Sequence, residues 1–99
     1  MSRSDQMKHA AGKAAAIIKL LSHPDRLVLV CSIVEEEKSV SHLVEDLQLR
    51  QATVSQHLSK LREADIVKTR KVGQAVFYAL KDEKVAALVQ TLYEAYCPE

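Results

Sequence analysis

The chain has 99 residues, which is room for one domain around a single hydrophobic core. Hydrophobic residues make up 47% and charged residues 27%, with only two glycines and two prolines, so disordered and low-complexity classes are excluded. The longest apolar run, Leu27 to Cys31, is too short to span a membrane, and no apolar signal region opens the chain. Because two cysteines are too few for a disulfide scaffold, we expect a cytoplasmic protein with reduced thiols and no membrane partner.

The net charge of +1 is unevenly distributed. Residues 50–71 contain six basic and two acidic residues, whereas the segments before and after them are each net negative. This excess of positive charge in one short segment is typical of a surface that binds a polyanion. A solvated helix face gives a similar pattern, so the charge alone does not decide the function.

Helical periodicity predicts two helices in the first third of the chain. Ser4 or Asp5 is placed to cap the first, an alanine-rich helix that runs to about Leu21. After a break, Pro24 suits the first position of a second helix that runs to about Glu36. The residues expected to face inward from this second helix are Leu27, Val30, Cys31 and Val34.

The middle of the chain predicts two short helices joined by a tight turn. Val40 is expected on a short edge strand, and Ser41 at the cap of a helix that ends at Leu47. After the turn at 48–50, another helix covers 51–64, with one narrow apolar stripe and a polar opposite face. Its apolar positions are Val54, Leu58 and Leu61.

In the last third, strand periodicity gives way to a final helix. Asp65 is expected to end the preceding helix in the left-handed conformation, and residues 66–79 then alternate as a hairpin that turns at Gly73. Asp82 caps a last helix whose apolar positions extend to Tyr96. That stripe is wide for a terminal helix with one neighbour, so it predicts, with the alanine-rich first helix, contact with a second copy of the chain.

Two short helices joined by a tight turn and followed by a basic hairpin indicate a winged helix-turn-helix. We therefore expect residues 1–99 to form a single winged-helix DNA-binding domain that is mainly α-helical, with a small β-hairpin wing. The predicted molecule is homodimeric, with the first and last helices as its dimer interface.

Two segments of the chain resemble the ArsR-type (SmtB/ArsR) repressors. Leu21 to Leu27 (LSHPDRL) is similar to the opening of that family's second helix, and Leu47 to Ala64 (LQLRQATVSQHLSKLREA) to its recognition segment. The resemblance covers nearly the whole chain. Two positions depart from the family pattern: Arg50 stands where a small capping residue is usual, and Asp65 where glycine is usual.

The polar face of the 51–64 helix is our candidate for reading DNA bases. A helix fits the major groove, where short polar side chains reach base edges and nearby basic side chains reach phosphates. The expected recognition-helix contacts are Gln51, Thr53, Ser55, Gln56, Ser59 and Lys60. The expected phosphate and wing contacts are Arg50, Arg62, Lys68, Arg70, Lys71 and Gln74. We expect a pseudo-palindromic operator in double-stranded DNA as the partner, and His57 to pack between helices.

The usual metal sites of this family have no counterpart in the sequence. Its thiolate site requires cysteines on the helix before the recognition helix, and residues 39–45 contain none. Its other site needs histidine on the last helix, and residues 82–97 contain none. We therefore expect no cofactor and no metal at the usual sites. An unusual metal site that involves Cys97, His9 or Cys31 stays open as an alternative.

The two cysteines suggest a different kind of sensor. Two unremarkable thiols are the simpler interpretation. The pair also resembles the dithiol subgroup of the family, the HlyU-like and BigR-like regulators, in which a cysteine of the second helix faces one near the C-terminus. That resemblance implies that Cys31 and Cys97 react with a small oxidant or a sulfane-sulfur inducer and become linked. Which thiol attacks first stays open; accessibility favours Cys97, because burial would raise the pKa of Cys31.

The sequence therefore predicts a transcriptional repressor that leaves its operator when its thiols are modified. A repressor of the same fold with a metal inducer is one alternative, and a non-sensing winged-helix module that binds protein is another. No phosphate loop, nucleophile elbow or paired-carboxylate signature indicates an enzyme.

Overall fold

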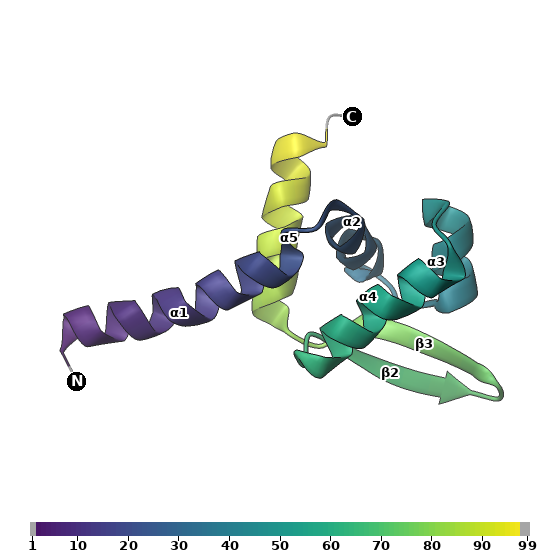
Figure 1. The fold of residues 1–99 in the computed structure, drawn as a ribbon, viewed down its shortest axis with the longest axis horizontal. Coiled ribbons are helices and arrows are strands. Elements are labelled where there is room, and N and C mark those ends of the chain that lie inside the picture. The colour runs from purple at the N-terminus through teal and green to yellow at the C-terminus, as the bar shows by residue number, and fades with distance from the viewer. Residues whose placement is uncertain (1, 98–99) are drawn as a thin grey trace.

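The fold is that of a computed structural model, which describes residues 2–97, so Met1, Pro98 and Glu99 lie outside the account. Within the described residues, five helices and three strands form a mainly α-helical winged helix-turn-helix, and the predicted fold class is confirmed. The elements are α1 (Arg3–Leu21), α2 (Pro24–Ile33), β1 (Lys38–Ser39), α3 (Val40–Leu47), α4 (Gln51–Glu63), β2 (Val67–Val72), β3 (Ala75–Leu80) and α5 (Glu83–Tyr96). Helices α2 to α4 and the sheet form the body, while α1 projects from it as an arm (Figure 1).

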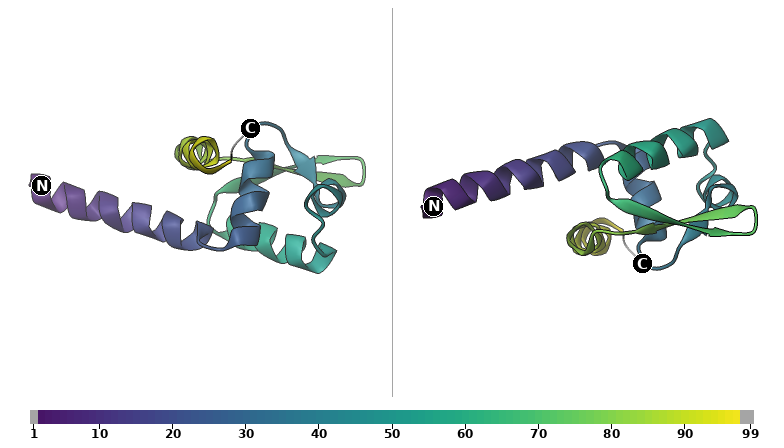
Figure 2. Two further views of the ribbon diagram at one scale, coloured as in Figure 1. Left: turned by 90° about the horizontal axis from the view of Figure 1, so that it is seen from above. Right: turned by 90° about the horizontal axis from the view of Figure 1, so that it is seen from below.

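Helix α1 begins earlier than predicted. Ser2, and not Ser4 or Asp5, is its N-cap, and the Ser2 hydroxyl accepts a hydrogen bond from the Asp5 amide at 3.1 Å. Asp5 instead lies in the first turn, where its charge favours the positive end of the helix dipole. Of all the α1 residues only Leu21 is buried, and Figure 2 shows most of the helix extending away from the body in both views.

Helix α2 starts with Pro24 as predicted but ends at Ile33, before the expected Glu36. The reason is electrostatic, because three successive carboxylates at the C-terminal end of a helix oppose its dipole. The inward positions also differ: Leu29, Val30 and Ile33 are buried, while the expected inward residues Leu27, Cys31 and Val34 are only partly covered. Because α2 is packed against α1, α3, α5 and β3, its remaining faces are partly covered as well.

The entry to α3 corrects two expectations. The short strand β1 consists of Lys38 and Ser39, and Val40 is already the first residue of α3. Ser39, and not Ser41, is the cap, with its hydroxyl accepting a hydrogen bond from the His42 amide at 3.1 Å. Ser39 ends the strand that pairs with β3, so α3 begins directly after it, and Leu43 is buried in the core.

The three strands form one antiparallel sheet in the order β1-β3-β2. The β2–β3 hairpin pairs Val67 with Leu80 and Val72 with Ala75, and Gly73 takes a positive φ of 61° in its two-residue turn, as predicted. Asp65 has a φ of 62° after α4, so its predicted left-handed conformation is confirmed.

A single aliphatic core fixes which face of α4 points outward. Val54, Leu58 and Leu61 are buried, as the stripe predicted, and they hold α4 against the rest of the body. In α5, Val85 and Val89 are buried, but Tyr96 is 80% exposed and is not covered by its own chain. None of the helices in the described residues is long and apolar enough to cross a membrane.

Candidate nucleic-acid interface and thiol pair

The outward face of α4 carries the residues predicted to read DNA. Five of the six are exposed, and Thr53 is half-buried at the border of the core. The exposed five are Gln51, Ser55, Gln56, Ser59 and Lys60. Arg50 occupies the N-cap position without a side-chain hydrogen bond to the helix, so its exposed guanidinium is not used as a cap.

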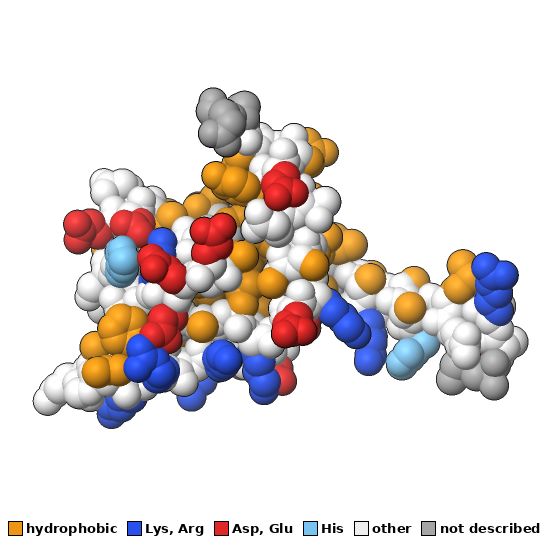
Figure 3. All heavy atoms as spheres, turned by 180° about the vertical axis from the view of Figure 1, so that it is seen from behind, with side chains coloured by type: hydrophobic (Ala, Val, Ile, Leu, Met, Phe, Trp, Pro, Cys, Tyr) orange, Lys and Arg blue, Asp and Glu red, His pale blue; other side chains and the backbone are white. Residues whose placement is uncertain are grey.

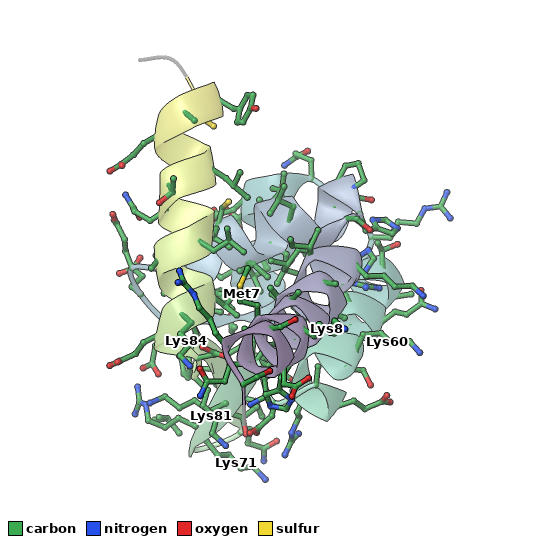
Figure 4. The ribbon with its side chains drawn as sticks, turned by 90° about the vertical axis from the view of Figure 1, so that its left-hand side faces the viewer. Met7, Lys8, Lys60, Lys71, Lys81 and Lys84 are labelled. Atoms are coloured by element: carbon green, nitrogen blue, oxygen red, sulfur yellow. The ribbon has the colours of Figure 1, made fainter. Side chains whose placement is uncertain are left out.

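The hairpin and the end of α4 add the basic side chains. Arg62, Lys68, Lys71 and Gln74 are all exposed. In Figure 3 lysine and arginine side chains gather along the edge of the molecule that carries the hairpin. Figure 4 shows Lys60 and Lys71 pointing away from the body into solvent. One edge of the protein therefore combines a polar helix face with positive charge, which is the arrangement that phosphate and base contacts require.

Arg70, a predicted phosphate contact, already has a partner within the chain. Its guanidinium donates hydrogen bonds to both carboxylate oxygens of Glu37, with Nε 3.0 Å from Oε1, and lies 5.6 Å from the centre of the Phe77 ring. These hydrogen bonds hold the pKa of the Glu37 carboxyl below its ordinary value. Sequence reasoning missed this pair, because 33 positions separate the two residues in the chain.

His57 packs between helices, as predicted. It is 5% exposed, its Nδ1 accepts a hydrogen bond from Arg26 Nε at 3.3 Å, and the His23 ring stands edge-on with ring centroids 4.5 Å apart. Burial lowers the pKa of His57, and the positive charges of His23 and Arg26 lower it further. Arg26 also donates to the Leu20 carbonyl at 2.9 Å, so these contacts tie the end of α1 and the start of α2 to α4.

One cluster in the described residues has the composition of a metal site. The ligand atoms of His23, Asp25 and His57 all lie within 4.8 Å of one another. Nδ1 of His57 is occupied by the Arg26 hydrogen bond, and the guanidinium places a positive charge where a metal ion would bind. We therefore interpret the cluster as a packing element. Cys31, Cys97 and His9 belong to no three-ligand group in residues 2–97.

The two cysteines come from adjacent elements. Cys31 is half-buried on α2, Cys97 is exposed directly after α5, and both are free thiols. Helix α2 packs on α5, and the Cys97 amide continues the helix by donating to the Tyr93 carbonyl at 2.8 Å. Burial raises the pKa of the Cys31 thiol, and the negative charge of Cys97 raises it further. Cys31 and Tyr93 of α5 line one pocket, and Tyr93 lies one helical turn before Cys97.

An open pocket of about 510 Å³ lies beside Cys31, between the end of α2, the loop that follows it and α5. We call it the thiol pocket; it is lined by Cys31, Ser32, Val34, Glu35, Glu36, Lys38, Val89, Gln90 and Tyr93. A second, more apolar groove of about 720 Å³ lies between α1 and α5. We call it the α1–α5 groove; it is lined by Ala10, Lys13, Ala14, Ala16, Ile17, Ile18, Asp82, Lys84, Val85 and Leu88.

Sequence comparison places this architecture among known regulators. Residues 23–69 match the model of the "Bacterial regulatory protein, arsR family". The chain is 44% identical, over all its residues and 86% of the relative, to the biofilm growth-associated repressor of Xylella fastidiosa. It is 37% identical to the transcriptional activator HlyU of Vibrio cholerae, over 93% of this chain and 85% of that protein.

Solved structures agree with the sequence relatives. The crystal structure of the transcriptional repressor BigR from Xylella fastidiosa is similar with a TM-score of 0.88 and 44% identity, over the full length of both chains. The transcriptional regulator HlyU from Vibrio vulnificus gives a TM-score of 0.91 at 38% identity, over 97% of this chain and all of that one. The resemblance to the HlyU-like and BigR-like subgroup is thereby confirmed. The chain belongs to the ArsR family of bacterial regulatory proteins, as a winged helix-turn-helix transcriptional regulator and not an enzyme.

Proposed function

We propose that this protein is a homodimeric repressor that binds a pseudo-palindromic operator and leaves it when Cys31 and Cys97 become linked. The observation that carries the proposal is that Cys31 on α2 and Tyr93 on α5 line one pocket, with Tyr93 one helical turn before Cys97. The repressor activity has its support in the name of the Xylella fastidiosa relative, which is 44% identical to this chain.

DNA binding has its support in the exposed face of α4 and the basic hairpin next to it. Gln51 and Gln56 lie on the outward side of α4, where a glutamine amide can pair with the edge of an adenine. The lysines and arginines around them position the protein by contacting phosphates, without reading sequence. A dimer making about 6–10 phosphate contacts is expected to lose roughly 10³–10⁵ in affinity between about 50 and 200 mM salt.

The homodimer has its support in α1. This helix has 19 residues, of which only Leu21 is buried, whereas helices in proteins owe most of their stability to packing of an apolar face. Met7 is 64% exposed and Ile18 58% exposed, and Ile18 lines the α1–α5 groove. Figure 4 shows α1 and α5 seen along α1, with Met7 on the arm. A second copy packed on both helices covers these side chains and sets two α4 helices about 34 Å apart, one per half-site.

The thiol chemistry is a two-step exchange with a persulfide, RSSH. The Cys97 thiolate attacks the outer sulfur, a bond forms from its Sγ to that sulfur, the S–S bond of the donor breaks, and RS⁻ leaves and is protonated. The Cys31 thiolate then attacks Sγ of Cys97 and expels HS⁻, so that the protein loses two electrons and the sulfane sulfur is reduced to sulfide. A direct disulfide requires Cα atoms within about 7 Å, and sulfur retained between the residues relaxes that limit.

A link between the cysteines reaches the DNA-binding face through α2. Cys31 lies on α2, and Arg26 at the start of the same helix is hydrogen-bonded to His57 on α4. A bridge that draws α2 toward the end of α5 therefore shifts the helix to which α4, the recognition helix, is hydrogen-bonded. A small change there alters the spacing of two helices in a dimer, and hence the fit to two half-sites.

The test is fluorescence anisotropy of a duplex operator, isolated by selection from random DNA, with the fully reduced protein. We expect tight binding, release after treatment with an organic tetrasulfide or diamide, and no release in Cys31→Ser or Cys97→Ser. Release in both serine variants would overturn thiol control. Stoichiometric Zn²⁺, Cu⁺ or Cd²⁺ binding that weakens DNA affinity of the reduced protein would favour a metal inducer instead.

A further inference from the structure

The thiol pocket is the route by which a small molecule reaches Cys31. The cysteine is half-buried on α2, so a donor must enter the space between the end of α2 and α5 to bring a sulfur atom to Sγ. The apolar part of the lining comes from Val34, Val89 and Tyr93. A pocket of about 510 Å³ is in the range that small-molecule sites occupy.

The charges that line the thiol pocket are predominantly negative. Glu35 and Glu36 are both exposed lining residues, so their carboxylates stand at the mouth. Of the described residues that line the pocket, Lys38 is the only basic one, and its Nζ forms a salt bridge with Asp46 at 3.3 Å. A donor entering the pocket therefore meets two carboxylates and a lysine whose charge is already balanced.

We propose that the thiol pocket admits neutral and cationic sulfane-sulfur donors to Cys31 and disfavours anionic donors, which react at the exposed Cys97 instead. This rests on the proposed function and adds a second entry point to it: a donor that enters the pocket reacts at Cys31 first, and the Cys97 thiolate then attacks Sγ of Cys31 and expels the retained group as a persulfide anion. Two unit charges several ångströms apart near a protein surface repel enough to slow entry by about threefold to tenfold, and the effect weakens with salt. Glutathione-derived donors are anionic, whereas hydroxyalkyl and aminoalkyl polysulfides are not.

The reaction at Cys31 is a simple displacement. With a trisulfide, R–S–S–S–R, the Cys31 thiolate attacks the central sulfur, an Sγ–S bond forms, one S–S bond of the donor breaks, and RS⁻ leaves with the electron pair and is protonated by water. Cys31 retains the S–S–R group. The R groups occupy the mouth during the displacement, so their charge faces Glu35 and Glu36.

The experiment uses the full chain with Cys97→Ser, which leaves Cys31 as its single thiol. Initial rates of adduct formation are measured by intact mass with glutathione trisulfide, bis(2-hydroxyethyl) trisulfide and cysteamine trisulfide, each divided by the rate with 2-mercaptoethanol. We expect the neutral and cationic probes to be about threefold to tenfold faster than the anionic one. In Glu35→Gln/Glu36→Gln the ratio is expected to fall toward one, as it is in about 0.5 M salt.

The matched control is Glu63→Gln/Glu83→Gln, which changes the net charge equally at two exposed residues outside the pocket, and it is expected to keep the preference. Circular dichroism checks that each variant is folded. Equal normalised rates for the three probes would overturn the proposal. The proposal would also be overturned if glutathione trisulfide reacts slowly and Glu35→Gln/Glu36→Gln does not accelerate it. That result would show that the size of the probe, and not its charge, limits the rate. Because no DNA is present, failure here is distinct from failure of operator release.

Discussion

Arg26 and His57 join the start of α2 to the middle of the recognition helix through a hydrogen bond of 3.3 Å from Nε to Nδ1. The contact requires a neutral imidazole, because a protonated Nδ1 has no lone pair to accept with. Helix α2 also carries Cys31, so one helix is in contact with both the thiol pair and the DNA-reading element.

The protonation state of His57 makes stability depend on pH. Its pKa in the folded protein lies below the ordinary value of 6.5, chiefly because the ring is buried. As the pH falls below 6.5 the unfolded chain binds a proton first, so stability is fully present above that pH and is lost toward the lower folded pKa, by at most about 1.4 kcal/mol per pH unit. Urea unfolding between about pH 8 and pH 5 measures this. His57→Gln is expected to flatten the profile.

Glu37 holds Arg70, a basic residue of the hairpin wing, in an ion pair. Replacing its carboxylate by an amide removes the negative charge that now holds Arg70, so Glu37→Gln frees the guanidinium for a phosphate. We expect operator affinity to rise severalfold and the slope of log affinity against log salt to steepen by about one. Anisotropy titrations over a series of salt concentrations measure both, and Arg70→Gln in the same background is expected to abolish the gain. A weaker complex in Glu37→Gln would show that the carboxylate orients Arg70 for DNA.

Base contacts and phosphate contacts are separable by substitution. Gln56→Ala on the outward face of α4 is expected to cost about 1–3 kcal/mol on the operator and to relax its preference at one position. Lys71→Ala on the hairpin is expected to weaken binding to operator and random DNA alike and to lower the salt slope by about one. Competition titrations with single-base operator variants distinguish the two. Unchanged sequence preference in Gln56→Ala would remove that residue from the recognition face.

The projecting arm predicts what disrupts the dimer. A charge at Met7 and Ile18 is incompatible with an apolar contact, so Met7→Asp/Ile18→Asp is expected to sediment as a monomer at micromolar concentration while the wild type sediments as a dimer. Val72→Asp changes another exposed apolar residue, on the hairpin, and is expected to remain dimeric. A monomeric wild type would contradict the homodimer outright.

Local chemistry explains which parts of the fold were predictable from sequence. Asp82 caps α5 by accepting hydrogen bonds from the amides of Lys84 at 2.8 Å and Val85 at 3.3 Å, and Pro24 is the first residue of α2. Both helix starts depend only on residues that are neighbours in the sequence, so both were predictable. The choice between Ser39 and Ser41 as the cap of α3 depended on the pairing of β1 with β3, and the partner residues of that pairing lie far along the chain.

The candidate site also has one part that was predictable from local sequence and one part that was not. The exposed face of α4 follows from the spacing of Val54, Leu58 and Leu61, which determines the outward side by elimination. The Arg70–Glu37 pair joins residues distant in sequence, and no local pattern marks them as partners. The pairing of the two cysteines came from the family resemblance, since spacing along the chain does not indicate which helices pack together.

The central claim is that a link between Cys31 and Cys97 is what releases DNA. The most direct test follows DNA release and link formation in one sample. The protein bound to fluorescent operator is titrated with organic tetrasulfide. At each step one aliquot is used for anisotropy and another for intact mass with peptide mapping. We expect the fraction of released operator to rise with the fraction of protein that carries the Cys31–Cys97 link. Release that precedes the link, or linked protein that still binds operator tightly, would contradict it.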